Sequence, residues 1–446
     1  MNTIEHILMN NYTHMKRLNN TIKIYLGIIS LSLTTYACAP EIDSFESSAG
    51  SDVDFTKYIA VGNSLTAGFA DRGLYLEGQQ VAFPNLIAEQ LKNVGGGTFN
   101  TPFFSEEQRN GSGYLQLKSL TDGQPVMEQV TSNLAYREAG KLTKYTGKIH
   151  NYGVPGMRVD LAYIPQFGAL NMYFERLLPE AEVGTKSYFD FVTTRSHTFF
   201  SFWLGNNDVL GYAMNGAYEN PEDATTTFTS VTNFTNGYGN FINTLTTNGQ
   251  KGVVATIPDV STIPFFTTVT TARLQAGVEA STGGAFDEIY ISTASGVRIA
   301  TAEDLFTLSF PTDTLGKTSN GILAYGLIPQ NPLHDRFVID KDEVAEIAGR
   351  VNAFNTVIKQ VAASKKLAIA DAHAYLNKVK TTGISYNGIN VNAAFIQGNA
   401  FSLDGIHLTP LGNALMANLF IDAINLQYNA RIPKVDATKY RGVKYP

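Results

Sequence analysis

The chain has 446 residues, of which 44% are hydrophobic and 16% are charged, and its formal net charge is −6. This length and hydrophobic content suffice for one large α/β domain or two ordinary ones. The chain lacks the clustered Lys and Arg of a nucleic-acid-binding surface, so we expect no nucleic-acid partner.

The N-terminal segment has the pattern of an export signal that ends at the only cysteine, Cys38. An apolar run of about ten residues, 24–33, follows basic residues. It is too short to cross a bilayer as a helix, which takes ~20 residues, but it suits a signal peptide. Because the segment resembles a bacterial lipoprotein signal, we expect residues 1–37 to be a signal peptide and Cys38 to carry a lipid. Tyr36 and Thr35 depart from the usual pattern, and an ordinary secretory signal is the alternative.

Residues 38–55 are acidic, Ser-rich and poor in large apolar groups, which predicts a flexible tether. The folded domain is expected to begin at about Thr56 and to occupy residues 56–446. A lipidated, exported chain of this kind is expected in the bacterial cell envelope, as an outer-membrane lipoprotein whose anchor holds it on the membrane. The sequence does not indicate an oligomeric state.

From Thr56 onward, short apolar runs alternate with helical periodicity, which predicts a parallel sheet between layers of helices. The third run, HTFFSFWL, is almost continuously apolar, as in a strand buried on both faces. Spacings of three and four predict long helices over 228–245 and 344–361. The last helix is expected to start at Pro410, with Thr409 as its N-cap. The predicted strands are 58–62, 148–152, 197–204, 252–257 and 367–370.

Two stretches, near 95–147 and 268–335, break this alternation. Unstructured loops of such length are uncommon in a compact domain. We therefore expect both to be elaborated insertions with small helices or hairpins of their own.

Ser64 directly follows the first predicted strand, within the segment GNSLTAG at residues 62–68. A tight turn from a strand into a helix can expose a serine hydroxyl and direct backbone N–H groups toward a bound anion. Gly and Ser also populate ordinary turns, so this segment alone favours a structural turn.

Asp404 and His407 stand three residues apart, just before the last predicted helix. A serine nucleophile needs a base to take its proton, and the base needs a carboxylate that fixes its tautomer. A pair with this spacing can form a hydrogen bond. An acidic helix start beside a solvated histidine is the alternative, and spacing alone does not separate the two.

Two further motifs follow predicted strands. The segment LGNND, residues 204–208, comes at the carboxyl edge of the sheet, where ligand sites of α/β proteins form, and a side-chain amide there can donate to an oxyanion. Gly156 follows the second strand and allows a backbone N–H to approach a substrate closely. A simple loop glycine is the alternative.

Taken in chain order, Ser64, Gly156, Asn207 and the Asp404–His407 pair resemble the motifs of the SGNH (GDSL-type) hydrolase family. The resemblance covers about residues 57–425, apart from the two insertions. It implies a three-layer α/β/α sandwich with a central parallel sheet, of the SGNH or flavodoxin-like type. One departure is Asn63, which stands where the family usually has the aspartate of Gly-Asp-Ser. This is not the aspartate of the triad, so the chemistry should survive.

By this resemblance Ser64 is the nucleophile, His407 is the general base and then the acid, and Asp404 orients His407. The oxyanion hole would combine the backbone N–H groups of Ser64 and Gly156 with the side-chain amide of Asn207. The implied activity is hydrolysis of a carboxylic ester through an acyl-enzyme. The substrate would be a small-molecule, glycan or lipid ester, and no cofactor is expected.

Two alternatives stay open. An acyltransferase would use the same acyl-enzyme with a sugar hydroxyl as acceptor, because both reactions share the first half-reaction. A non-catalytic lipoprotein that binds glycans or lipids on this scaffold is favoured only by Asn63.

Other residues offer competing sites. Asp371–His373 and His334–Asp335 are further acid–histidine pairs, for which we favour structural roles because neither precedes a capped terminal helix. No cluster has the spacing of a metal site, so we predict no metal. Four aromatic residues could line an acyl pocket, although packing roles are more common: Phe103, Phe104, Phe265 and Phe266.

Overall fold

The computed structural model describes residues 9, 11–19, 45–121 and 124–446. The chain divides into two compact units, Met1–Glu46 and Ser47–Pro446. Residues 11–19 of the first unit are helical, whereas Cys38, the predicted lipidation site, lies outside the described residues. Within the described part of the chain, no helix combines the length and the apolar character needed to cross a membrane.

A five-stranded parallel sheet forms the centre of the second unit, in the spatial order β13-β8-β7-β1-β6. Numbered along the chain, this is the order 2-1-3-4-5, in which the direction of winding reverses between β1 and β7. All five predicted strands are present, although the second begins at residue 151 instead of 148. Their bounds are β1 (Tyr58–Gly62), β6 (Asn151–Gly153), β7 (Phe199–Trp203), β8 (Lys251–Ala255) and β13 (Ala368–Ala370).

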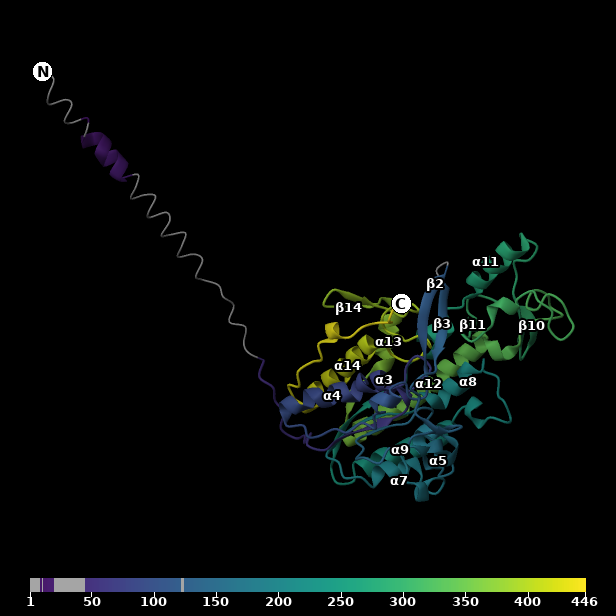
Figure 1. Cartoon of the computed structure of the whole chain (residues 1–446), viewed down its shortest axis with the longest axis horizontal. Coiled ribbons are helices and arrows are strands. Elements are labelled where there is room, and N and C mark those ends of the chain that lie inside the picture. Colours follow the sequence, from purple (N-terminus) through teal and green to yellow (C-terminus); the bar gives the residue numbers. More distant parts are fainter. Residues whose placement is uncertain (1–8, 10, 20–44, 122–123) are drawn as a thin grey trace. The chain divides into compact units, whose positions relative to one another are not determined.

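Helices connect the strands and cover both faces of the sheet (Figure 1). The predicted long helices are present as α9 and α12, and α14 starts at Pro410 as expected, where the Gly412 N–H donates to the Thr409 hydroxyl at 3.0 Å. The helix bounds are α2 (Ser64–Ala67), α3 (Leu76–Gln80), α4 (Phe83–Leu91), α5 (Phe167–Leu170), α6 (Met172–Glu175), α7 (Tyr188–Thr193), α8 (Asn207–Met214), α9 (Val231–Leu245), α10 (Pro264–Thr267), α11 (Thr271–Thr282), α12 (Lys341–Lys365), α13 (Ala372–Thr381) and α14 (Pro410–Tyr428).

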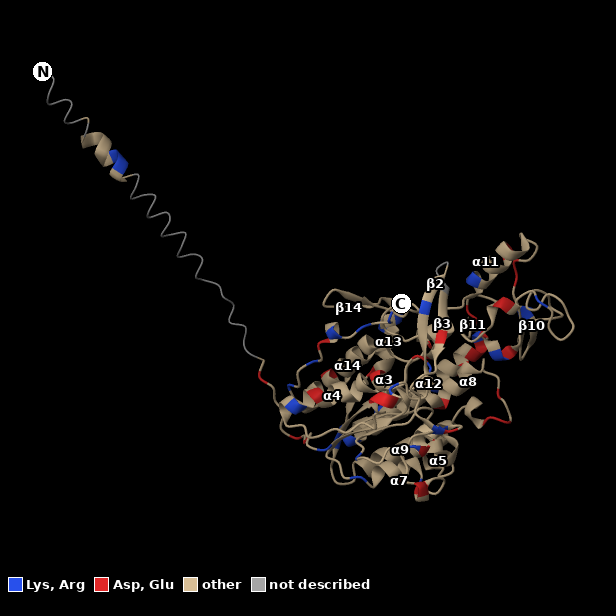
Figure 2. Ribbon diagram, viewed as in Figure 1, with Lys and Arg blue, Asp and Glu red and all other residues tan. Residues whose placement is uncertain are grey.

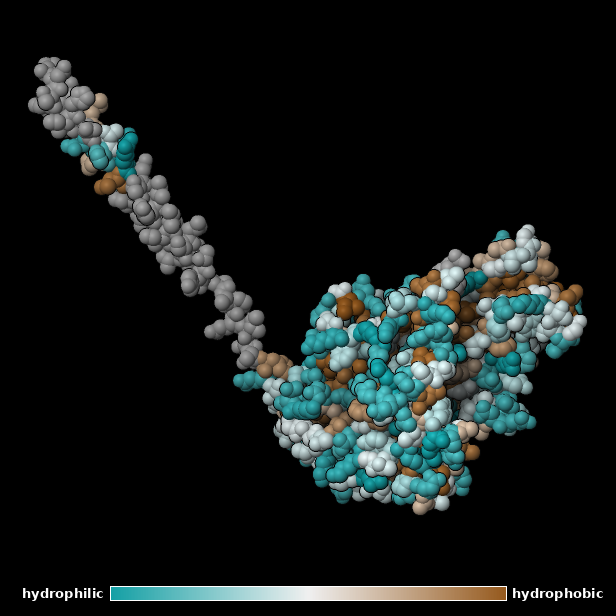
Figure 3. Space-filling view, in the orientation of Figure 1, coloured by the Kyte–Doolittle hydropathy of each residue, from teal (hydrophilic) through white to brown (hydrophobic). Residues whose placement is uncertain are grey.

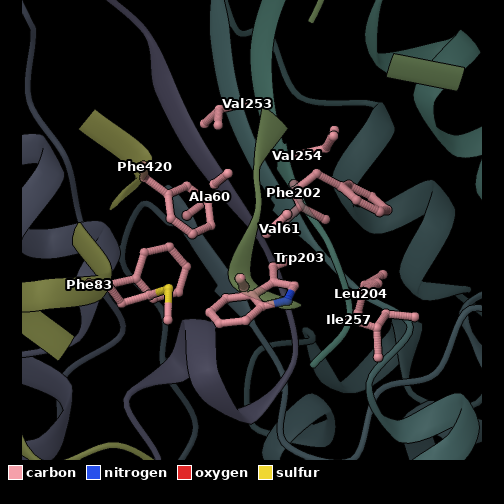
Figure 4. Packing of buried hydrophobic residues seen from close by; sticks show 14 of the residues in the cluster. Ala60, Val61, Phe83, Phe202, Trp203, Leu204, Val253, Val254, Ile257 and Phe420 are labelled. Atoms are coloured by element: carbon pink, nitrogen blue, oxygen red, sulfur yellow. The ribbon is translucent and has the colours of Figure 1, made fainter. Parts of the chain in front are cut away.

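Neighbouring residues of β7 point to opposite faces of the sheet, and each packs against a different layer of helices (Figure 4). The ring of Phe202 lies 5.0 Å from that of Phe241 on α9. The ring of Trp203 lies 5.7 Å from that of Phe420 on α14. Both strand residues are almost completely buried. The unit is therefore a three-layer α/β/α sandwich with a central parallel sheet, as predicted.

The two stretches that break the strand–helix alternation carry antiparallel hairpins. In the second stretch, Ile291, Phe306 and Leu333 belong to an apolar cluster separate from the main core. Figure 3 shows apolar side chains gathered around α11, in the same stretch. The hairpin strands of these stretches are β2 (Tyr114–Thr121) with β3 (Gln124–Val130), β4 (Tyr136–Glu138) with β5 (Lys141–Leu142), and β9 (Tyr290–Thr293) with β10 (Gly296–Ile299). β11 (Leu305–Phe306) pairs with the distant β12 (Val338–Ile339), and a further hairpin, β14 (Ile384–Tyr386) with β15 (Ile389–Val391), lies outside both stretches.

The folded unit begins before Thr56, which corrects the predicted end of the tether. The backbones of Ser48 and Arg431 exchange hydrogen bonds of 3.3 and 2.8 Å. Phe55 is only 2% exposed and packs edge-on against Phe199, with ring centroids 4.8 Å apart. Residues 47–55 therefore belong to the fold, because a backbone bridge and a buried ring hold them in place. Acidic and basic residues are interspersed over the unit (Figure 2).

Candidate active site

The candidate residues lie at the carboxyl edge of the sheet, around the point where its winding reverses. Ser64 is the first residue of α2, directly after β1, and Asn207 is the first residue of α8, after β7. Gly156 lies in the loop after β6, on the other side of β1. In open α/β sheets such a reversal leaves a crevice that commonly binds ligands.

Two glycines allow the turn that carries Ser64. A Cβ on Gly62 would lie 2.0 Å from the Thr66 hydroxyl oxygen, and a Cβ on Gly153 would lie 2.3 Å from the Ala67 nitrogen. Any side chain at either position would therefore push α2 away from the strand ends. Since Ser64 opens α2, its own N–H has no partner within the helix.

Asn63 stabilises the turn that precedes Ser64. Its side-chain oxygen accepts a hydrogen bond from the Leu65 N–H at 3.1 Å and so caps α2, as an aspartate oxygen could. The Nδ2 atom of Asn63 is buried and has no hydrogen-bond partner among the described residues. Asn63 thus caps the helix and leaves one amide donor without a partner among the described residues.

Ser64, His407 and Asp404 form a chain of hydrogen bonds. The Ser64 Oγ lies 2.8 Å from His407 Nε2, and His407 Nδ1 lies 2.8 Å from Asp404 Oδ2. An ionised aspartate can only accept, so Nδ1 carries the hydrogen and Nε2 is free to accept from the serine hydroxyl. Ser64 and His407 are 343 residues apart in the sequence.

Asp404 is buried, and its carboxylate accepts several hydrogen bonds. Besides His407 Nδ1, it accepts from the backbone N–H groups of Arg72, Ile406 and His407 and from the Ser402 hydroxyl, at 2.8 to 3.0 Å. Burial alone would raise the pKa of Asp404, but His407 and these backbone N–H groups together lower it well below its ordinary value. The residue is therefore an aspartate anion, as the hydrogen-bond chain requires.

A short turn at residues 71–72, after α2, contacts Asp404, which lies 332 positions after Arg72 in the sequence. Asp71 and Arg72 have φ values of 54° and 63°, a left-handed conformation that costs most residues roughly 1–2 kcal/mol each. The Asp71 N–H donates to the Ser402 hydroxyl at 3.0 Å, and the Leu403 N–H donates to Asp71 Oδ1 at 2.8 Å. Two residues before the turn, the Phe69 ring lies 4.8 Å from the His407 ring.

Asn207, at the start of α8, is hydrogen-bonded to the loop that carries Gly156. Asn207 donates through Nδ2 to the Met157 carbonyl at 3.0 Å, which uses one of its two amide hydrogens and leaves the other available. Gly156 has a φ of 80°, which explains why glycine is favoured there. Asp208, the next residue of α8, also binds this loop, because its buried carboxylate accepts from the Val159 N–H at 3.0 and 3.1 Å.

A cavity opens beside Ser64, between the ends of β7 and β8. Ser64, Asn207 and His407 line it together with apolar side chains that include Trp203 and Ile257, both visible in Figure 4. The remaining lining residues are Asn63, Leu65, Asn206, Val209, Leu210, Pro258, Asp259, Val260, Ile263, Leu376, Phe401, Ile406 and Leu408. The four aromatic residues considered from the sequence, at positions 103, 104, 265 and 266, are not part of this lining.

The other acid–histidine pairs serve other contacts. Asp371 caps α13 and accepts from Thr256 Oγ1 at 2.9 Å and from Lys359 Nζ at 3.1 Å. His373 Nδ1 lies 3.4 Å from the Asn377 amide nitrogen. His334 Nδ1 accepts from the Arg336 N–H at 3.2 Å and caps a short 3₁₀ turn. Over residues 9, 11–19, 45–121 and 124–446, no group of three or more His, Cys, Asp or Glu could hold a metal ion.

The sequence does not match any family model or any of the curated proteins. Several solved structures are similar to it. An alpha/beta hydrolase enzyme from the metagenome of Lake Arreo, Spain, is 12% identical, with a TM-score of 0.36, over 84% of this chain and 97% of that one. A catalytic mutant of an acetylxylan esterase from Geobacillus stearothermophilus is 10% identical (TM-score 0.34; 84% and 96% covered). The lipase/acylhydrolase from Enterococcus faecalis is 11% identical (TM-score 0.31; 85% and 99% covered).

Proposed function

We propose that this protein is a serine esterase that cleaves a carboxylic ester through an acyl-enzyme. The observation that carries the proposal is the hydrogen-bond chain from Ser64 through His407 to the buried carboxylate of Asp404. This arrangement supplies a nucleophile, a base of fixed tautomer and an orienting anion, which are the three roles that acyl transfer needs.

In the first half-reaction, Ser64 Oγ attacks the ester carbonyl carbon while its proton moves to His407 Nε2. The tetrahedral oxyanion is stabilised by the Ser64 and Gly156 N–H groups and by the free amide hydrogen of Asn207. His407 then gives its proton to the departing alcohol oxygen, and the C–O bond to the alcohol breaks. Asp404 stays ionised throughout and stabilises the imidazolium.

In the second half-reaction, water attacks the acyl carbon and gives a proton to His407 Nε2. The collapse of this intermediate breaks the bond to Ser64 Oγ, releases the carboxylic acid and returns the proton to the serine. An alcohol in place of water would complete an acyl transfer instead. Transfer is therefore measured in the same assay by adding a sugar or glycerol and following ester formation.

The test is Ser64→Ala, measured with a panel of p-nitrophenyl esters. We expect the substitution to lower kcat by at least ~10⁴-fold, because loss of a nucleophile removes the covalent route. The urea concentration at the midpoint of unfolding should change no more than it does for a typical surface substitution. Ser364→Ala, an exposed serine on α12, is the matched control and should keep full activity. Equal activity of Ser64→Ala and wild type would refute the assignment.

We further propose that Cys38 carries a lipid and anchors the protein in the bacterial cell envelope, as an outer-membrane lipoprotein. Its support is the apolar run at residues 24–33, which is separated from the only cysteine by four residues. Labelled palmitate should be incorporated into the wild-type protein and not into the Cys38→Ala protein. Equal labelling of the two would overturn the anchor and leave the esterase proposal untouched.

A further inference from the structure

The cavity beside Ser64 limits the polarity of the group that the site accepts. Its floor and walls are mainly apolar, and Trp203 turns its only polar atom away, since Nε1 donates to the Thr256 carbonyl at 3.2 Å. Lys and Arg do not occur among the lining residues, and Asp259 is the only carboxylate among them. An anionic group would meet no countercharge there, so the cavity suits an uncharged, apolar chain.

The volume of the cavity also limits the length of the chain that it can hold. It offers about 60 Å³ in which the centre of a water-sized atom can lie. One such atom needs roughly 10–15 Å³ of this space, so about four to six non-hydrogen atoms fit. One of them is the carbonyl oxygen, which leaves room for an acyl group of roughly three to five carbons.

The order in which the alcohol leaves and water enters assigns the cavity to the acyl part of the ester. During turnover the alcohol must leave and water must enter while the acyl group stays bound to Ser64. The buried side chains of Trp203, Phe401 and Leu408 line the cavity beside this bound group. The group that stays attached is therefore the one that the cavity can hold.

Building on the proposed function, we propose that the substrate is an ester of a short, uncharged acyl group of about three to five carbons, such as a butyryl ester, and that this cavity holds the acyl chain. Longer chains would have to displace packed side chains. An acetyl group, with only two carbons, would leave up to half of this space unfilled.

The test is kcat/KM over a series of p-nitrophenyl esters from acetyl to decanoyl. Each methylene buried in the cavity should raise kcat/KM about fourfold, so butyryl should exceed acetyl about 15-fold. Beyond about six carbons the value should fall. Turnover that depends on Ser64 but is equal for acetyl, butyryl and decanoyl esters would overturn the cavity assignment and leave the esterase. Absence of Ser64-dependent turnover of every ester would overturn the proposed function itself.

Two substitutions link the preference to the cavity. Leu376→Ala, on α13, should enlarge the cavity and move the preferred chain about two carbons longer, whereas Ile257→Trp should fill it and favour acetyl. Leu177→Ala is the control, since Leu177 is as buried as Leu376 (4% and 5% exposed) but does not line the cavity. If the preferred length stays the same in both cavity variants, or moves equally in the control, the assignment is wrong.

A second inference rests on the turn at Asp71 and Arg72. The turn is left-handed at two successive residues other than glycine, and strain of this kind persists only where the surroundings enforce it. Its hydrogen bonds to residues 402–404 span 331 and 332 positions of sequence. Burial also raises the pKa of Asp71 to about 6, while the Tyr75 hydroxyl and the Leu403 N–H stabilise its anion.

We infer that Asp71 and Arg72 are positioning residues that hold Asp404 in line with His407. The Arg72 N–H donates to Oδ2 of Asp404, the same oxygen that accepts from His407 Nδ1. Asp71 fixes the adjoining residues, Ser402 and Leu403. The turn thus sets the direction from which the carboxylate meets the imidazole, without touching the substrate.

The test compares Asp71→Ala with Asp71→Asn on the preferred ester. Asp71→Ala should lower kcat about tenfold with KM within about twofold, because a small misplacement of Asp404 affects chemistry more than binding. Asp71→Asn keeps one acceptor and tolerates the left-handed backbone, so it should recover most of kcat. Asp313→Ala, an exposed aspartate, is the control. A folded Asp71→Ala protein with unchanged kcat, or with a change in KM alone, would overturn the inference.

Discussion

Asp208 is predicted to make the stability of the fold depend on pH. Its side chain is fully buried beside Asn207, where it accepts from the Val159 N–H and from the Thr229 hydroxyl at 2.8 Å. Burial raises its pKa to about 6, and Asp160 adds to the rise, whereas the Val159 and Thr229 donors and Arg158 counteract it. Its anion is therefore less favourable in the folded protein than in the unfolded chain.

The sign and size follow from that pKa. Because the folded value lies above the ordinary value of about 3.9, Asp208 stabilises the fold fully below pH ~4, and the contribution is lost as pH rises through 6. The total loss is about 3 kcal/mol, of which about 1 kcal/mol falls between pH 5 and pH 7. Asp208→Asn cannot ionise, so its free energy of unfolding lacks this decline.

The assay is urea unfolding of wild type and Asp208→Asn at several pH values. Trp203 is the only tryptophan and is 1% exposed, so its fluorescence reports the loss of the sheet core. The difference in free energy of unfolding, wild type minus variant, should fall by about 1 kcal/mol from pH 5 to pH 7. Val209→Ala removes buried carbon without removing an ionisable group, so its difference should be independent of pH. A constant difference for Asp208→Asn would refute the reasoning.

Three further substitutions test other parts of the structure. Asn207→Ala should lower kcat ~100–1000-fold with little change in KM, as expected for loss of an oxyanion donor, measured on the preferred ester. Thr409→Ala removes the cap of α14 and should cost about 1 kcal/mol of unfolding free energy in urea. Phe354→Ala deletes a fully buried ring stacked 3.9 Å from Phe234 and should cost about 3–5 kcal/mol in the same assay, with kcat retained in the folded fraction.

The sheet and the long helices could be predicted because their signals are local. FFSFW, the sequence of β7, is apolar at four of its five positions because the strand is buried on both faces. Thr409–Pro410 marks a helix start by its own chemistry. Ser64 and His407 could be proposed because each stands at an element boundary within a short motif. Their contact at 2.8 Å could not be read from either motif alone.

The residues that position the triad could not be predicted from the sequence, for a physical reason. Asp71-Arg72-Gly73 has the composition of an ordinary surface turn, and nothing in it indicates bonds to residues more than 300 positions away. Ser402 likewise has no local signature. The early start of the fold was missed because residues 47–55 are polar on average, while one ring, Phe55, determines their packing.

The wide separation of the two halves of the site has a consequence for biosynthesis. Ser64 leaves the ribosome early, whereas residues 402–407 come after the whole sheet and both insertions have been made. Until α14 has folded back beside α4 and β13, the serine has no base and the strained turn at 71–72 has nothing to hold. On the proposed chemistry, a nascent or partly folded chain is inert toward esters. Activity then appears only with the finished fold, which makes turnover a direct measure of correctly folded protein.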